Sequence, residues 1–184
     1  MRRADFEHVI AAAANIIGED EFVVIGSQAI LGAVSEPPEE LLQSMEADLY
    51  PRHRPDLSDD IEEALGDGSP FEQQFGYFAH AVGPETDKAP AGWQDRLIRV
   101  EIPPRVASKR QPVAWCLEPH DLVLAKLARG SERDWDYART AIRANIVEID
   151  VLLVRAPTLP VGAEHRQVVV DSLRALAGRP TEAN

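Results

Sequence analysis

The feature that most constrains the fold is an amphipathic helix that stops at a glycine and is followed at once by a short apolar strand. The apolar residues of the helix recur every three or four positions, which is the spacing of one helix face. They are Phe6, Val9, Ile10, Ala13, Ile16 and Ile17. Asp5 is the expected N-cap and Gly18 the expected stop. Glu21–Gly26 (EFVVIG) then has the composition of a short buried strand, so this part of the chain is expected to be α/β.

Strands and helices continue to alternate as far as residue 117. Gly26-Ser27 is expected to turn the chain into a short helix over Gln28–Val34. Met45–Tyr50 (MEADLY) alternates polar and apolar residues, as a half-buried strand does. The other expected elements are a helix over Ser58–Leu65, capped by Ser58 and ended by Gly66, and strands over Tyr77–Val82, Leu97–Ile102 and Val113–Leu117.

From Pro119 onward the pattern becomes helical. The expected helices are Pro119–Arg129, Ser131–Arg143, Asp150–Val154 and Ala163–Ala177. Proline is well suited to the first turn of a helix, which favours a start at Pro119. The sequence therefore predicts a core of residues 1–112 that contains the strands and a helical C-terminal lobe of residues 113–184.

Composition excludes several classes of protein. The net charge of −12 argues against a protein that coats nucleic acid. A local RNA site stays open, because arginines gather in the helical lobe. They are Arg129, Arg133, Arg139 and Arg143. The single cysteine, Cys116, rules out an internal disulfide and agrees with a cytoplasmic location. No apolar run is long enough for a membrane span, and no Cys/His cluster has the spacing of a zinc site.

Two short segments together indicate chemistry on phosphates. Glu46 and Asp48 are two residues apart on an expected strand, so both side chains point to one face and can share a divalent ion. Gly26-Ser27 lies at the start of an expected helix, where backbone N–H groups and a hydroxyl are available to a phosphate. Glycine allows the phosphate to approach the backbone closely. Phosphoryl-type transfer depends mainly on positioning and charge neutralisation, which a metal ion supplies.

Three segments of the chain resemble the nucleotidyltransferase superfamily and, within it, the AbiEii/MenT-like toxin nucleotidyltransferases. They are VVIGSQAILG, SMEADLYPR and PHDLVLAKLARGSERDWDYAR, and the resemblance covers roughly residues 20–145. It implies an α+β fold with a small mixed sheet and a helical C-terminal lobe, and Mg²⁺-dependent use of an NTP. Toxins of this type resemble enzymes that add nucleotides to the 3′ end of tRNA, and they are usually paired with an antitoxin.

The resemblance also assigns roles to residues of this chain. Gly26 and Ser27 would hold the phosphates of the NTP, and Glu46 and Asp48 would bind Mg²⁺. Lys126 would reach the triphosphate, and Asp134 would match a late acidic residue of the family. The usual motif is Asp-x-Asp, so glutamate at position 46 is a departure that changes the geometry at the metal. A third metal carboxylate is not clearly marked, and Glu101 is the candidate.

Each of these features also has a structural explanation. Gly26-Ser27 could be an ordinary turn with Ser27 as N-cap, Glu46 and Asp48 the solvated face of an edge strand, and Asp134 an acid that stabilises a helix start. The histidines are scattered and are expected to have no catalytic role. They are His8, His53, His80, His120 and His165. Two other functions stay open, namely transfer of the nucleotide to a protein hydroxyl and a non-catalytic, antitoxin-like member that binds a partner.

Overall fold

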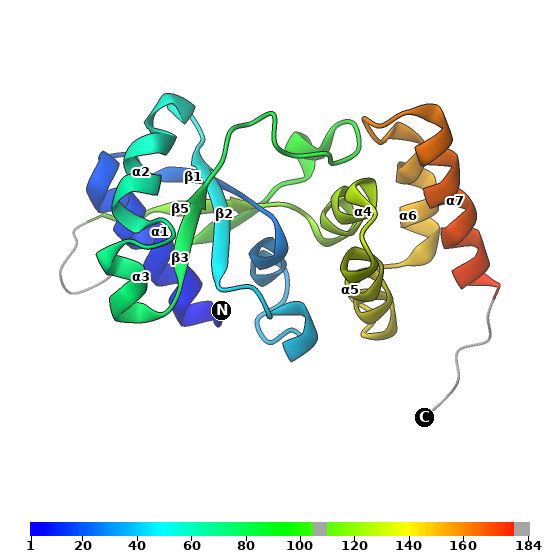
Figure 1. Ribbon diagram of the computed structural model, residues 1–184, viewed down its shortest axis with the longest axis horizontal. Helices are drawn as coiled ribbons and strands as arrows, with labels where there is room; N and C mark the ends of the chain where they lie inside the picture. Colours follow the sequence, from blue (N-terminus) through cyan, green and yellow to red (C-terminus); the bar gives the residue numbers. More distant parts are fainter. Residues whose placement is uncertain (105–109, 179–184) are drawn as a thin grey trace.

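The computed structural model describes residues 1–104 and 110–178 of the chain. Its strands form one five-stranded sheet in the order β3-β2-β1-β5-β4 (Figure 1). They are β1 (Glu21–Ile25), β2 (Glu46–Pro51), β3 (Phe78–Ala81), β4 (Ile98–Glu101) and β5 (Val113–Cys116). Two of the pairs are parallel, β1 with β5 and β2 with β3, whereas β1 with β2 and β4 with β5 are antiparallel. The predicted α+β fold with a small mixed sheet is confirmed.

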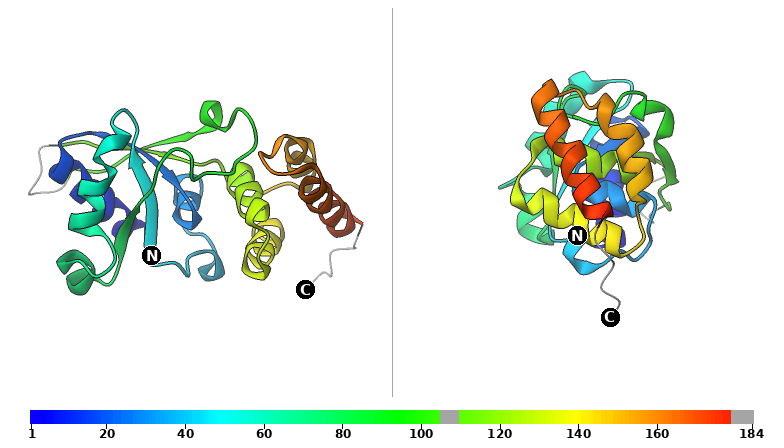
Figure 2. Two further views of the ribbon diagram at one scale, coloured as in Figure 1. Left: turned by 45° about the horizontal axis from the view of Figure 1, so that its top comes forward. Right: turned by 90° about the vertical axis from the view of Figure 1, so that its right-hand side faces the viewer.

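The α-helices form two groups, and short 3₁₀ helices lie in the connections. They are α1 (Arg3–Ile17), α2 (Ser58–Leu65), α3 (Pro70–Phe75), α4 (Pro119–Arg129), α5 (Glu132–Arg143), α6 (Ile149–Arg155) and α7 (Ala163–Ala177), with the short 3₁₀ helices η1 (Ser27–Gly32), η2 (Glu39–Leu41), η3 (Pro55–Leu57), η4 (Trp93–Arg96) and η5 (Ala156–Thr158). In Figures 1 and 2, α1–α3 gather around the sheet, and α4–α7 form a helical block at the other end. Among the described residues, no helix has the length and apolar character that a membrane span requires.

The core beneath the sheet forms because helix and strand periodicities bring apolar residues to the same layer. Phe6 and Ile10 of α1 and Phe22 of β1 are fully buried. Burying each such side chain contributes about 1.5–3 kcal/mol before the entropy cost of ordering it. Ala47 and Leu49 of β2 are also fully buried. Because side chains alternate along a strand, the residues between them face away from this core.

An ion-pair network holds α4 in place. Asp121 of α4 is fully buried and accepts hydrogen bonds from Arg96 of η4 at 2.6 Å and from Arg155 of α6 at 2.9 Å. Glu118 caps the start of α4 and also accepts from Arg155. Removing one partner of such a buried pair costs about 3–5 kcal/mol, because the other charge is left without compensation. The network therefore fixes the position of α4 and of Lys126 in its last turn.

Several local predictions differ from the structure. α1 begins at Arg3, so Asp5 lies in its first turn, where its carboxylate accepts a hydrogen bond from the Arg2 N–H at 3.0 Å. Ser58 does not cap α2 but donates from Oγ to the Val82 carbonyl at 3.2 Å. The short helix expected over Gln28–Val34 is present as the 3₁₀ helix η1, which begins at Ser27 and ends at Gly32. It passes close to β5, since a Cβ added at Gly32 would lie 2.9 Å from Cys116 Sγ.

β5 lies inside the sheet, although it falls on the C-terminal side of the expected boundary at residues 112 and 113. It pairs with β1 on one side and with β4 on the other. α4 begins at Pro119, three residues after the strand ends. The connection from sheet to helical block is therefore short, which limits how far α4 can lie from the end of β1.

Candidate active site

Glu46 and Asp48 lie on the face of β2 that does not pack on the core. Both are partly buried, in alternation with the fully buried Ala47 and Leu49. Asp48 pairs in register with Ile25, the last residue of β1. The chain turns at Gly26 immediately afterwards. The antiparallel pairing of β1 with β2 therefore brings together the two segments that the sequence marks for phosphate chemistry.

Gly26 is in direct contact with the Asp48 carboxylate. Its φ of 65° and ψ of −168° fall in a region that is open essentially to glycine alone. A Cβ added at this position would lie 2.7 Å from Asp48 Cγ and closer still to Oδ2. Glycine is thus needed for two reasons, the backbone conformation and the room that the carboxylate occupies. The expected role of Gly26, close approach of a phosphate, requires the same absence of a side chain.

Ser27 connects the turn to the helical block. Lys126 of α4 donates from Nζ to Ser27 Oγ at 2.8 Å, across 99 positions of sequence. Tyr137 of α5 donates from its hydroxyl to the Ser27 carbonyl at 3.3 Å. The ammonium of Lys126 lies 4.5 Å from the centroid of the Tyr137 ring, a cation–π contact. Three elements, η1, α4 and α5, therefore meet at one hydroxyl and one ammonium group.

The ammonium group of Lys126 is held in a poorly solvated place. The residue is only 6% exposed. Burial lowers its pKa to about 8, and the nearby charge of Arg129 lowers it further, while Asp134, Asp48 and Glu46 act in the opposite direction. A lysine in this state is close to neutral at moderately alkaline pH. An added anion such as a phosphate would favour its charged form.

A cleft of about 990 Å³ opens beside these groups. Ser27, Glu46, Lys126 and Asp134, four of the residues expected from the sequence, line it. The other lining residues come from η2 and the residues after it, from the end of α4, and from α5 and its N-cap: Glu40, Leu41, Gln43, Ser44, Arg129, Ser131, Arg133, Asp136, Tyr137, Arg139, Thr140 and Arg143. Gly26 directly precedes Ser27, and Asp48 follows Glu46 by two residues on the same face of β2, so both lie next to the cleft. The cleft is therefore bounded by carboxylates on the sheet side and by arginines on the helical side.

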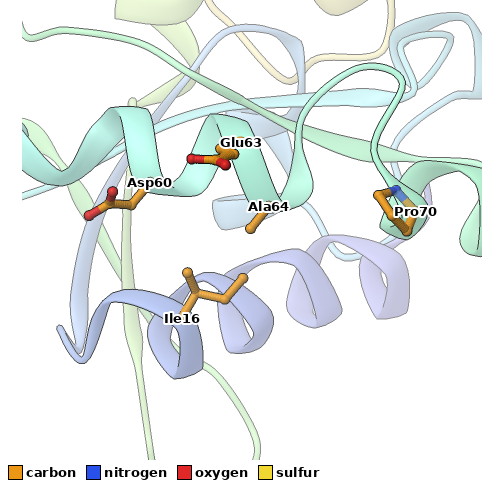
Figure 3. Close-up of a pocket in the computed structure, with 5 residues that line it drawn as sticks. All are labelled: Ile16, Asp60, Glu63, Ala64 and Pro70. Carbon is orange, nitrogen blue, oxygen red and sulfur yellow. The ribbon is translucent and has the colours of Figure 1, made fainter.

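A second, shallower pocket of about 550 Å³ lies between α1 and the α2–α3 segment (Figure 3). Its lining consists of Ile16, Asp60, Glu63, Ala64 and Pro70. None of these residues is cationic, and none was expected to take part in the chemistry. An acidic and apolar lining is unsuited to a phosphate, so the larger cleft is the candidate site.

His80 lies beside the site although the sequence gives it no catalytic role. β3 runs parallel to β2, and its His80 is in register with Asp48. His80 Nδ1 lies 2.8 Å from Asp48 Oδ1. Burial acts to lower the pKa of His80, but the hydrogen bond and charge of Asp48 outweigh it and raise the pKa. No local signal marks this histidine, because its place depends on which strand pairs with β2.

A comparison with known families agrees with this geometry. The model of a family described as "nucleotidyltransferase of unknown function (DUF6036)" matches residues 4–167. The chain belongs to this nucleotidyltransferase family. No curated protein and no solved structure matches it. The family supports the predicted nucleotidyltransferase superfamily, whereas the narrower resemblance to AbiEii/MenT-like toxins stays a prediction.

Asp134 is engaged in helix capping. Its carboxylate accepts hydrogen bonds from the backbone N–H of Ser131 at 3.3 Å and from the Ser131 hydroxyl at 2.8 Å, and the other oxygen pairs with Arg129 at 2.8 Å. Burial acts to raise the pKa of Asp134, but the hydrogen bonds from Arg129 and Ser131 outweigh it and lower the pKa. Asp134 thus lines the cleft while both of its oxygens are occupied by neighbouring groups.

Glu101 is not brought to the site. It is exposed on β4 and pairs with Arg99 at 2.6 Å. In the sheet it is opposite Val113, which is opposite Glu21 at the start of β1, whereas Asp48 is opposite the end of β1. With strands about 4.8 Å apart, the three steps from β4 to β2 alone place it roughly 14 Å away. Glu101 could bind the same metal ion as Asp48 only if β4 were next to β2, and β1 and β5 lie between them.

The carboxylates of β2 fit a metal ion that is shared with a phosphate. Within residues 1–104 and 110–178, no group of three His, Cys, Asp or Glu side chains converges on one point that could hold a metal ion. Asp48 nevertheless lies directly over Gly26, in room that any side chain there would fill. Divalent ions in nucleotide sites are commonly held by one or two carboxylates and completed by substrate phosphates. The donors present at β2 suit that arrangement.

Proposed function

We propose that this chain is a cytoplasmic, Mg²⁺-dependent nucleotidyltransferase that transfers a nucleotide from an NTP to RNA, at the 3′ end of a tRNA, and acts as the toxin of a toxin–antitoxin pair. The observation that carries the transfer chemistry is the contact of Lys126 with Ser27 at a cleft that Glu46 also lines. The tRNA acceptor, the toxin role and a cognate antitoxin as partner rest on the resemblance of the three sequence segments.

In this proposal Ser27 and Lys126 hold the triphosphate. The Ser27 hydroxyl and the backbone N–H groups at the start of η1 donate to phosphate oxygens. The Lys126 ammonium is already buried beside that hydroxyl, so little water has to be removed from it when a phosphate binds. Electrostatic attraction is stronger in such a poorly solvated place than in water. Tyr137 keeps the ammonium directed to Ser27 through its ring and hydroxyl.

The transfer step forms one bond and breaks one. An acceptor hydroxyl oxygen attacks the α-phosphorus, the bond from that phosphorus to the bridging oxygen breaks, and pyrophosphate leaves with the electron pair. The hydroxyl proton passes to solvent. A Mg²⁺ ion bound at Glu46 and Asp48 would neutralise charge on the phosphates during the step. Gly26 supports this arrangement because it leaves room for the Asp48 carboxylate.

The arginines at the end of α4 and along α5 support an anionic acceptor. Arg129 is paired with Asp134 and Arg139 with Asp136. In the part of the chain that the structure describes, Arg133 and Arg143 make no ion pair, and both line the cleft. Arginine side chains of this kind commonly contact nucleic-acid phosphates.

A protein hydroxyl is the second candidate acceptor. The net charge of −12 favours it, because long RNA is repelled by an acidic protein. A third reading, a non-catalytic binding protein, is favoured by glutamate at position 46 and by the remote position of Glu101. Each reading predicts a different fate for the nucleotide.

The test is label transfer from each α-³²P-NTP with Mg²⁺, to total tRNA and to total protein in separate reactions. We expect one NTP to label tRNA, and Asp48→Asn to abolish the label. Asp60→Asn, in the shallow pocket between α1 and α2, is the matched carboxylate control and should keep full activity. Label on protein alone would replace the RNA acceptor, and no label in either fraction would overturn the transfer activity. Growth arrest on expression, absent in Asp48→Asn, tests the toxin role.

A further inference from the structure

The contact between His80 and Asp48 differs from the contact between His120 and Glu118 in how the second ring nitrogen is used. His120 also lies close to a carboxylate, at 2.6 Å from Glu118, but its second ring nitrogen accepts from the Glu148 N–H at 2.9 Å. Both nitrogens of His120 are therefore used to hold α4. The His80 side chain is 48% exposed, and its other nitrogen makes no hydrogen bond to a described residue. His80 is thus held only at the end that faces Asp48.

The distance between His80 and Asp48 suits two ligands of one ion. Metal–nitrogen and metal–oxygen bonds to divalent ions are about 2.1 Å long. Two such ligands at right angles lie about 3 Å apart. His80 Nδ1 and Asp48 Oδ1 lie 2.8 Å apart, on adjacent strands that fix their register. A turn of the imidazole and of the carboxylate away from their mutual hydrogen bond would direct a lone pair of each at an ion placed outside the pair.

The surroundings favour an ion at this position. Asp48 lies over Gly26, which leaves the carboxylate room next to the start of η1. Glu46 is two residues before Asp48 on the same face of β2, and it lines the cleft. A phosphate in the cleft would therefore lie near His80 and Asp48. Phosphate oxygens would complete the coordination that two protein ligands leave open.

We propose that His80 and Asp48 together ligate the divalent ion of this site, and that the ion is a first-row transition metal such as Mn²⁺, Co²⁺ or Zn²⁺ in preference to Mg²⁺. Imidazole nitrogen is a good ligand for these ions, whereas Mg²⁺ strongly prefers oxygen. The inference deepens the proposed function, on which it rests for the phosphate that shares the ion. It keeps the proposed transfer step but replaces the Mg²⁺ ion and the all-carboxylate site of that proposal with a transition-metal ion in a mixed nitrogen and oxygen site.

The competing explanation is that His80 is only a charged partner of Asp48. The two explanations predict opposite effects of removing the imidazole. If His80 is only an ion-pair partner, its loss frees Asp48 and cation binding at the carboxylate becomes tighter. If His80 is a ligand, its loss weakens the binding of Mn²⁺. The loss should be at least about tenfold, and because loss of a residue that only orients a ligand also costs about 10–100-fold, the ligand itself is identified by its nitrogen coupling to Mn²⁺.

The experiment measures Mn²⁺ binding to the full chain by electron paramagnetic resonance, without nucleotide and with a non-hydrolysable NTP analogue. We expect His80→Ala to raise the Kd for Mn²⁺ at least about tenfold. His53→Ala is the matched control, because His53 is another exposed histidine near a carboxylate, 3.4 Å from Glu21. It should bind Mn²⁺ as the wild type does. His80→Asp, a second variant, should lower the preference for Mn²⁺ over Mg²⁺, since it returns the site to oxygen ligands.

Pulsed measurements on the same samples identify the ligand directly. An imidazole bound to Mn²⁺ should give a ¹⁴N coupling in the wild type and in His53→Ala, and none in His80→Ala. Unchanged or tighter Mn²⁺ binding in His80→Ala, or no ¹⁴N coupling in the wild type, would overturn the inference. Nitrogen-coordinated Mn²⁺ with no nucleotide transfer would refute the proposed function alone. Transfer without that coupling would refute only the role of His80.

Discussion

Replacing Gly26 by alanine is expected to damage both the stability of the fold and the metal site. The backbone conformation at Gly26, with φ of 65° and ψ of −168°, costs a residue with a side chain about 1–3 kcal/mol. The added Cβ would also lie 2.7 Å from Asp48 Cγ and 3.1 Å from Asp48 Cβ. The Asp48 side chain must therefore rotate away, and its contact with His80 is lost.

Gly68→Ala is the matched control for this substitution. Gly68 also has a positive φ, of 77°, but a Cβ at that position would meet no atom within 4 Å. It should cost about 1–2 kcal/mol from the backbone alone and leave Mn²⁺ binding unchanged. Urea unfolding and Mn²⁺ titration of the two variants separate strain at the backbone from displacement of the carboxylate.

The pair Gly26→Ala and Asp48→Ala makes the test sharper. Once the Asp48 carboxylate is removed, the alanine at position 26 has no carboxylate to displace and meets only the Cβ at position 48, at 3.1 Å. The loss of unfolding free energy caused by Gly26→Ala should then be smaller by roughly 0.5–3 kcal/mol, the range for residues in contact. Strictly additive losses in the double variant, or a Gly26→Ala protein that binds Mn²⁺ normally, would refute the contact between these two residues.

Three other variants test the electrostatics. Burial raises the pKa of Asp87 to about 6, so its ionisation at pH 7 destabilises the folded state. Asp87→Asn should therefore raise the unfolding free energy at pH 7 by up to about 3 kcal/mol. Urea unfolding should show that this gain disappears below about pH 4, where Asp87 is protonated in both states. Wild-type affinity for a non-hydrolysable NTP should fall as pH rises through about 8, where Lys126 loses its charge, and calorimetry should find no fall in Lys126→Arg. Asp134→Asn should lower the unfolding free energy by about 1 kcal/mol through weaker capping and leave the Kd for Mn²⁺ unchanged; loss of Mn²⁺ binding would make Asp134 a ligand instead.

The sequence predicts those parts of the site that depend on local periodicity. Alternation along β2 correctly places Glu46 and Asp48 on the face opposite the core, because one strand period decides it. The glycine at position 26 was expected for a phosphate, and the structure adds the contact with Asp48, which only strand pairing creates. α3 was missed although Ser69 caps it, Pro70 is its first residue and Glu72 follows at the third position, a recognisable helix start.

The order of the strands in the sheet could not be predicted from local sequence patterns. Glu101 and His80 illustrate this in opposite ways, since both are polar residues on short strands. The order β3-β2-β1-β5-β4 puts His80 next to Asp48 and puts Glu101 three strands away. To decide which of the two residues joins the site, one must know which strand pairs with β2. That pairing depends on how α2 and α3, which connect β2 to β3 in the sequence, pack against the sheet.

A net charge of −12 is compatible with a cleft that binds phosphates, because many acidic side chains lie far from the cleft. Acidic side chains such as Asp60 and Glu63 lie beside α1, at the end of the molecule away from α5 (Figures 1 and 3). At physiological salt a charge is largely screened beyond about 8–10 Å of water, so those acids act weakly on a ligand in the cleft. There the pairing of neighbouring acids with Arg129 and Arg139 still leaves Arg133 and Arg143 for an anion. The arrangement of pairs inside the cleft, rather than the sum over the chain, therefore decides which substrate the site attracts.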